Sequence, residues 1–140
     1  MSLEQLSDKV RMLLRDHAID NFVNEARWIV AETLHISNGT LLSEPSRVVS
    51  AAQVRDVLAA TQRRIAGEPL SYILGSADFC GFEFDVDSRV LIPRPETEQI
   101  VEIVAAALNG GGSPRCLEVG VGSGCIAISL LLKVSNLTVV

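Results

Sequence analysis

Three glycines at alternate positions, Gly120, Gly122 and Gly124, are the residues of this sequence best suited to hold a ligand. They stand between the apolar runs 115–119 and 125–133, which predicts a strand, a tight loop and a helix. Because glycine has no Cβ, such a loop turns sharply and lets its backbone approach a ligand closely. The predicted helix directs its free N–H groups and positive dipole end at the same place, which favours a carboxylate or phosphate.

The spacing of these glycines distinguishes between two cofactor classes. The dinucleotide fingerprint G-x-G-x-x-G/A requires glycine or alanine at the position of Cys125, which disfavours NAD. Instead, Glu118 ends the predicted strand and G-x-G-x-G follows it. This order resembles the first motif of class I methyltransferases that use S-adenosylmethionine. A glycine-rich turn without a ligand is the alternative.

Composition limits the classes of function. The 140 residues, 48% of them hydrophobic, suffice for one domain or slightly more. The net charge of −5 disfavours a protein whose affinity comes from contacts with nucleic-acid phosphates, so we expect no direct nucleic-acid partner. Cys80, Cys116 and Cys125 are odd in number and lack C-x-x-C spacing, which favours neither disulfides nor a metal site and indicates a reducing, cytoplasmic location. No apolar run approaches membrane-spanning length, so no membrane partner is expected.

The elements upstream of the glycines begin with helices. Apolar residues at helical spacing predict helices over 3–16 and 20–35, with Ser2 as the N-cap of the first. Trp28 lies off the apolar face of the second helix, where it is either at the edge of the core, the interpretation we favour, or in a contact surface.

A third helix is predicted to open at Pro45 and Ser46 and to last to about residue 66, with Gly67 as its C′ residue. No strand pattern separates these helices. Residues 1 to about 70 are therefore expected to form a small all-α bundle.

The segments between the bundle and the glycines carry three further patterns. Residues 67–75, bounded by glycines, indicate a packed connector. Alternation of apolar and polar residues over 78–86 predicts a β-hairpin, which 90–92 is expected to extend. The segment 92–98 holds two prolines followed by acids, which favours a helix start at Pro95. The alternative is that this segment has no role in a site and only begins a helix.

Three of these segments together resemble the release factor glutamine N5-methyltransferases, the HemK/PrmC family. They are Gly-Glu-Pro-Leu-x-Tyr-Ile-Leu-Gly at 67–75, Leu-Ile-Pro-Arg-Pro-Glu-Thr-Glu at 91–98, and Glu-x-Gly-x-Gly-x-Gly at 118–124. The first two are far more specific than the glycine loop, which many methyltransferases share.

The resemblance implies an α+β fold in parts: a helical substrate-recognition bundle with its connector over 1–75, a β-hairpin linker over 76–92, and over 93–140 the start of a Rossmann-like class I methyltransferase domain. The implied partner is a class 1 peptide chain release factor, bound by a monomer and methylated on the glutamine amide of its Gly-Gly-Gln motif. The implied cofactor is S-adenosylmethionine, held by Gly120, Val121, Gly122, Ser123, Gly124, Glu118, Pro93, Arg94 and Thr97. Arg94 is expected to pair either with the cofactor carboxylate or with an acid such as Glu98.

Two residues depart from the family pattern: Glu118 replaces the commoner aspartate, and Val121 replaces a frequent threonine. The Asn-Pro-Pro-Tyr motif that would orient the glutamine amide is not among the 140 residues, and no catalytic residue is assigned. We therefore expect the chain to be the N-terminal part of a methyltransferase and to be inactive alone. The alternatives are a non-catalytic module that binds release factors and an adenine-N6 nucleic-acid methyltransferase.

Overall fold

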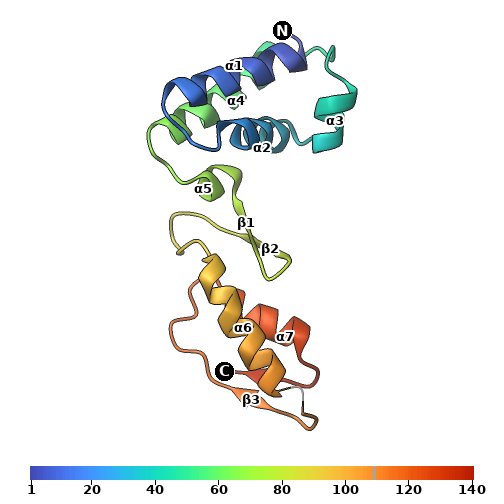
Figure 1. Cartoon of the computed structure of the whole chain (residues 1–140), viewed down its shortest axis with the longest axis vertical. Coiled ribbons are helices and arrows are strands. Elements are labelled where there is room, and N and C mark those ends of the chain that lie inside the picture. The colour runs from blue at the N-terminus through green and yellow to red at the C-terminus, as the bar shows by residue number, and fades with distance from the viewer. Residues whose placement is uncertain (109) are drawn as a thin grey trace. The chain divides into compact units, whose positions relative to one another are not determined.

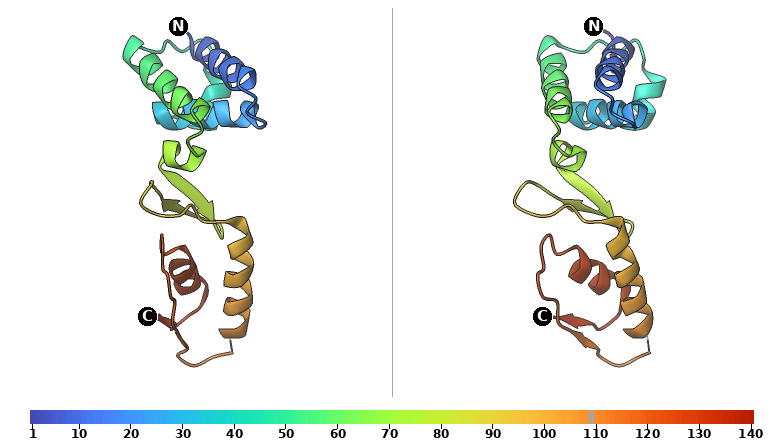
Figure 2. Two further views of the ribbon diagram at one scale, coloured as in Figure 1. Left: turned by 90° about the vertical axis from the view of Figure 1, so that its left-hand side faces the viewer. Right: turned by 60° about the vertical axis from the view of Figure 1, so that its left-hand side comes forward.

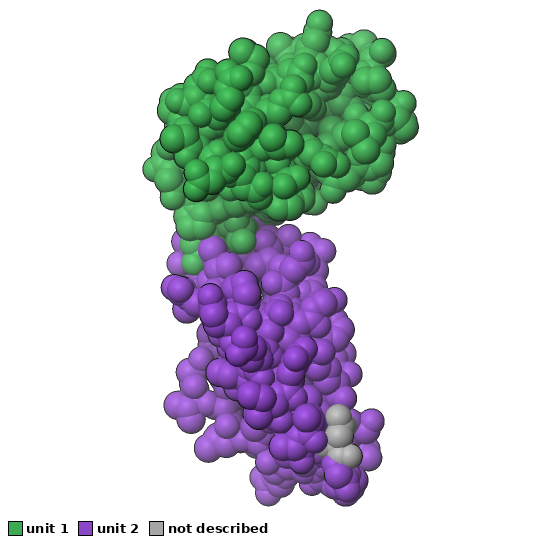
Figure 3. Space-filling view, viewed as in Figure 1, with its two compact units in different colours: residues 1–74 green, residues 75–140 purple. Residues whose placement is uncertain are grey.

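The computed structural model describes residues 1–108 and 110–140. The chain forms two compact units, residues 1–74 and 75–140, each with its own apolar core (Figures 1 and 3). The hairpin that the sequence places in a separate linker belongs to the second unit. It therefore shares a core with the helices that flank the glycine loop.

The first unit is helical, as predicted. Its helices are α1 (Leu3–Asp16), α2 (Phe22–Leu34), α3 (Asn38–Ser43), α4 (Ala51–Ile65) and α5 (Leu70–Leu74). Helices α1, α2 and α4 pack on one another, as the two views in Figure 2 show, and enclose a core that includes Leu6, Val10, Ile29 and Val57. These four side chains have no exposed surface, so burial of the apolar helix faces holds this unit together.

The start of α1 is fixed by local sequence. The Ser2 hydroxyl accepts a hydrogen bond from the Gln5 N–H at 3.2 Å, and the Gln5 side chain accepts one from the Ser2 N–H at 2.9 Å. This reciprocal capping box satisfies two groups that a helix end leaves without partners. The predicted N-cap is confirmed.

The predicted start of the third helix is wrong. Helix α4 begins at Ala51, with Ser50 as N-cap, rather than at Pro45. The intervening segment runs beside the start of α1: the carbonyl of Pro45 accepts the N–H of Glu4, and that of Arg47 accepts the N–H of Leu3. These bonds use donors at the helix start that would otherwise lack partners, which keeps the segment out of a helix.

Trp28 also departs from the core position that the sequence favours. The residue is 40% exposed, whereas its neighbour Ile29 on α2 is completely buried. Its place off the apolar helix face, rather than its hydrophobicity, decides its exposure.

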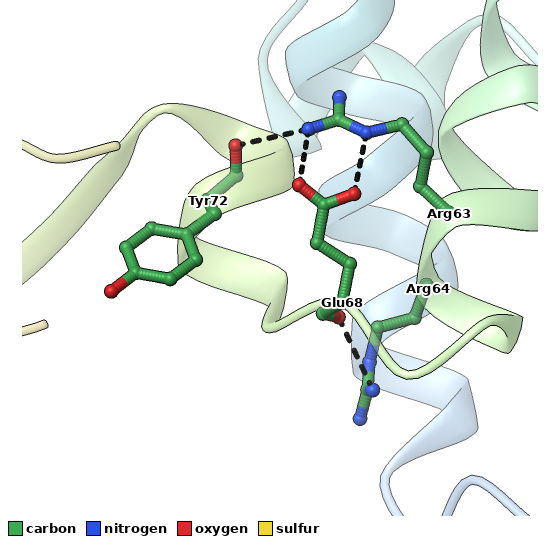
Figure 4. Close-up of polar contacts among 4 residues, drawn as sticks. All are labelled: Arg63, Arg64, Glu68 and Tyr72. Atoms are coloured by element: carbon green, nitrogen blue, oxygen red, sulfur yellow. Dashed lines mark hydrogen bonds and ion pairs between the residues drawn. The ribbon is translucent and has the colours of Figure 1, made fainter. Parts of the chain in front are cut away.

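The connector packs against the bundle, as predicted. Gly67 takes the left-handed backbone (φ +94°) that ends α4. The Arg63 guanidinium donates to both carboxylate oxygens of Glu68, at 2.8 and 2.6 Å, and to the Tyr72 carbonyl at 3.4 Å (Figure 4). The same ion pair lowers the pKa of Glu68 below its usual value. Arg64 donates to the Glu68 carbonyl, so two adjacent arginines hold the connector at the end of α4 (Figure 4).

The second unit opens with the predicted hairpin, β1 (Ser76–Phe79) paired antiparallel with β2 (Phe82–Asp85). Its two-residue turn, Cys80 and Gly81, has positive φ at both positions (+54° and +82°), the type I′ conformation whose twist matches the flanking strands. Residues 90–92 do not extend the hairpin as expected. They form a turn and an irregular approach to the next helix.

The remaining elements are α6 (Pro95–Leu108), β3 (Arg115–Cys116), α7 (Cys125–Lys133) and β4 (Thr138–Val139). Strands β3 and β4 pair in parallel, with α7 between them in the chain. Helix α6 packs on α7, and both contribute to a core that includes the buried Phe79 of the hairpin. This β-α-β arrangement places the glycine loop at the carboxyl end of β3.

Candidate functional site

A pocket of about 200 Å³ lies where the glycine loop meets the segment that leads into α6. The loop contributes Glu118 and residues 120–123, and the incoming segment contributes Pro93, Arg94 and Thr97. Eight of the nine residues that the sequence assigns to a cofactor site thus line one cavity. Segments some 25 positions apart in the sequence form its walls.

The backbone of the loop explains its three glycines. Gly120, Gly122 and Gly124 all have positive φ, at +80°, +58° and +77°. Only glycine adopts such conformations without strain. Around Gly120 and Gly122 a Cβ would meet no atom closer than 3.9 Å, so the space beside these two residues is open to a ligand.

Gly124 is the predicted site residue that does not line the pocket. It is the N-cap of α7, is buried, and donates its N–H to the Val121 carbonyl at 2.8 Å. A Cβ on Gly124 would lie 3.3 Å from the Ile128 side chain. Its role is to turn the chain tightly into the helix.

Glu118 occupies the strand end that the sequence predicts. Its N–H donates to the Val140 carbonyl at 2.9 Å, which continues the parallel pairing past β3. Its Oε2 atom is buried and has no hydrogen-bond partner among the described residues. A carboxylate oxygen removed from water in this way is stabilised by a positively charged donor, which the pocket leaves room for.

Four further residues line the pocket that sequence reasoning did not assign: Leu91, Ile92, Cys125 and Ile126. The first two precede Pro93 and the last two open α7. Their apolar character supplies a wall against which a flat or aliphatic ligand group packs. The only signal for them in the sequence is their adjacency to the assigned residues.

Arg94 lies at the pocket with an exposed side chain and forms no ion pair with any residue in the described part of the chain. The expected pairing with Glu98 is not formed. Instead, Glu98 Oε1 accepts the backbone N–H of Cys80 at 2.7 Å. The pairing of Arg94 with a cofactor carboxylate stays a prediction.

Two other site classes find no support in the described residues. Over 1–108 and 110–140, no group of three or more histidine, cysteine, aspartate or glutamate side chains is placed to hold a metal ion. Within the same residues, no helix is both long and apolar enough to cross a membrane.

Comparison with known proteins gives two results. The model of the PrmC N-terminal domain family matches residues 5–75, about half of the chain and nearly all of the first unit. Proteins named release factor glutamine methyltransferase match across both units. Those of Burkholderia pseudomallei and Geobacter sulfurreducens are 42% and 32% identical over 84% and 99% of this chain.

A third relative of the same name, from Nitratidesulfovibrio vulgaris, is 34% identical over 98% of this chain. The matched regions cover 41%, 48% and 46% of the three relatives' own lengths, so the chain spans less than half of the proteins it matches. Since the family model covers half of the chain and these relatives extend the similarity through the glycine loop, the chain belongs to the HemK/PrmC family of release factor glutamine methyltransferases and corresponds to their N-terminal portion.

Proposed function

We propose that the protein to which this chain belongs transfers the methyl group of S-adenosylmethionine to the glutamine side-chain amide in the Gly-Gly-Gln motif of a class 1 peptide chain release factor. The observation that carries this proposal is the pocket shared by Glu118, the glycine loop and the segment from Pro93 to Thr97. It combines an acid, open backbone and apolar walls in one place.

The residues of the pocket fit S-adenosylmethionine. The Glu118 Oε2 atom is buried and has no partner among residues 1–108 and 110–140, so it suits the ammonium group of the methionine moiety, because a buried carboxylate gains most from a charged donor. The exposed Arg94 guanidinium suits the methionine carboxylate. Gly120 and Gly122 leave the backbone bare for close approach.

The size of the pocket indicates how much of the cofactor it holds. Its volume of about 200 Å³ is below the roughly 300–1,000 Å³ of typical small-molecule sites. We infer that these residues hold the methionine end and that further residues complete the site in a Rossmann-like domain. The parallel pairing of β3 and β4 around α7 supports that fold, because ligands of open α/β sheets bind at the carboxyl ends of the strands.

The chemistry explains what the chain must supply. An amide nitrogen is a weak nucleophile, since its lone pair is delocalised into the carbonyl, whereas a bound sulfonium supplies an activated methyl group. The protein's task is therefore to hold both groups in line and to exclude water. The pocket residues orient the methyl donor. We propose that the 140 residues alone bind without transferring, because the amide-orienting motif is not among them.

The first unit is proposed to recognise the release factor. Its helices form a complete apolar core of their own, and the PrmC N-terminal domain model matches this unit. A chain with one unit for the cofactor and another unit with its own core suits an enzyme whose substrate is a whole protein, because contacts remote from the reacting group then position that group.

Titration of the ¹⁵N-labelled chain with S-adenosylmethionine tests the cofactor site. We expect the amide signals of Gly120, Gly122 and Ser123 to shift on binding, with ATP as the control nucleotide that leaves them unchanged. Signals that do not move at millimolar cofactor would contradict the proposed site. Methyl transfer is tested by joining this chain to the remaining segment of the Burkholderia pseudomallei relative and supplying labelled cofactor and an unmodified release factor, with label on the glutamine as the expected result.

A further inference from the structure

The two-residue turn of the hairpin leaves the backbone N–H of its first residue without a partner in the hairpin itself. In a type I′ turn the residue after the turn bonds back across it, while the N–H of the first turn residue points outward. Here that residue is Cys80, which is only partly exposed. A partly buried N–H of this kind requires an acceptor from elsewhere in the fold.

Helix α6 provides the acceptor. Glu98 Oε1 receives the Cys80 N–H at 2.7 Å, the short distance expected when the acceptor is charged. Glu98 lies on the same face of α6 as Val101 and Ala105, three and seven residues further on, and both of those are buried. The carboxylate thus extends the core-facing side of α6 as far as the hairpin turn.

This hydrogen bond supplies a directional restraint that the apolar contacts cannot supply. Val101 and Ala105 share a core with Phe79, but apolar contacts are non-directional and allow a helix to slide or rotate by small amounts. A hydrogen bond to a fixed backbone amide restricts both motions. The first turn of α6 is therefore registered against the turn of the hairpin.

The same helical turn carries one wall of the pocket. Thr97 directly precedes Glu98, Arg94 lies four residues before it, and the Thr97 N–H donates to the Arg94 carbonyl at 2.9 Å. We propose that Glu98 is a positioning residue: by holding the Cys80 amide it fixes the start of α6, and with it the placement of Arg94 and Thr97 against the glycine loop. This inference rests on the proposed cofactor site.

Three variants test this role. Glu98→Ala removes the acceptor, Glu98→Gln keeps an oxygen acceptor without the charge, and Glu96→Ala removes an exposed acid from the same helical turn. The first readout needs no cofactor: exchange of the Cys80 amide with solvent should be about tenfold faster in Glu98→Ala. The amide signal of Thr97 should also shift in that variant.

The second readout is the dissociation constant for S-adenosylmethionine, measured by following the amide signals of the glycine loop. We expect affinity to fall about tenfold in Glu98→Ala, and to be largely retained in Glu98→Gln and Glu96→Ala. Rescue by glutamine separates positioning from a general loss of stability, which thermal unfolding of each variant monitors.

The outcomes separate the two proposals. If the unmodified chain shows no cofactor binding, the proposed cofactor site fails, while Cys80 exchange and the Thr97 signal still decide whether Glu98 registers the helix. Unchanged Cys80 exchange in Glu98→Ala would overturn the positioning role. Equal loss of affinity in Glu96→Ala would also overturn it, because the effect would then come from the charge of the helix start.

Discussion

Replacing Gly122 by valine should weaken cofactor binding without any steric clash inside the protein. The residue has φ +58°, and a Cβ added there would have the Gly120 carbonyl oxygen, 3.9 Å away, as its nearest neighbour. The effect therefore comes from the backbone and from the space that the ligand needs. A β-branched residue held in the left-handed region costs about 1–3 kcal/mol.

This strain lowers the affinity for the ligand rather than the stability of the fold. In the free chain the exposed loop can relax to an unstrained conformation, whereas binding requires the glycine conformation to be restored. A penalty of about 1–3 kcal/mol corresponds to roughly a 5- to 150-fold loss of affinity for S-adenosylmethionine. Occupation of the pocket by the valine methyl groups adds to this loss. Isothermal titration calorimetry measures the difference directly.

Gly111→Val is the matched control. Gly111 has φ +88°, further from the left-handed region that other residues tolerate, and its surroundings are equally open, but it does not line the pocket. The control carries at least as much backbone strain and should bind the cofactor normally. Unchanged affinity in Gly122→Val, or an equal loss in Gly111→Val, would refute the assignment of Gly122 to the ligand site.

Three further predictions concern single side chains. Arg64→Met removes the partner of the nearly buried Glu25 carboxylate, 2.6 Å away, and should lower the free energy of unfolding by about 2–3 kcal/mol. Adding Glu25→Leu to the same chain should restore most of this loss. Urea unfolding measures both variants, and a double variant no more stable than Arg64→Met would contradict the reasoning. Arg89→Ala should raise the pKa of Asp87 from about 2 toward 3.8, because the hydrogen-bonded guanidinium favours the ionised form. A carboxyl group with a lowered pKa in the folded chain stabilises the fold at pH values above its unfolded pKa, and this stabilisation disappears as the pH falls toward 2. The variant should therefore lose a small, acid-sensitive part of the free energy of unfolding. Carboxyl ¹³C shifts of Asp87 that titrate as in the unmodified chain would argue against the ion pair. Ser50→Ala should destabilise the first unit by about 0.5–2 kcal/mol through loss of the α4 capping box, with Ser50→Asn as the conservative comparison in the same unfolding assay; equal stability of all three chains would show that the cap contributes nothing.

Local structure in this protein is predictable where its signals are local. The capping box of Ser2 needs only Gln5 three residues later, and the turn at Cys80 and Gly81 lies between two short alternating runs. The positive φ values of the loop glycines follow from the same kind of signal. In each case the interacting groups are a few residues apart, so spacing and residue type largely decide the conformation.

Contacts between distant segments depend on the tertiary structure. The sequence predicts too early a start for α4 because Pro45 and Arg47 bond to the first turn of α1, some forty residues away, and nothing in their own sequence indicates that partner. The sequence likewise offers Glu98 as a partner for Arg94, its neighbour on the chain, but core packing of α6 turns the carboxylate toward the hairpin.

The candidate site combines both kinds of information. Motif types and spacing identify its residues, since a glycine loop after a strand and a proline-bounded helix start are each visible in the sequence. The packing of α6 on α7 decides that these motifs line one cavity, that Gly124 lies outside its lining, and that a Glu118 oxygen is buried there without a partner among the described residues. The sequence alone determines which residue types each motif offers to a ligand. Burial of the apolar core that the helices and strands of the second unit share determines which of these residues lie in contact.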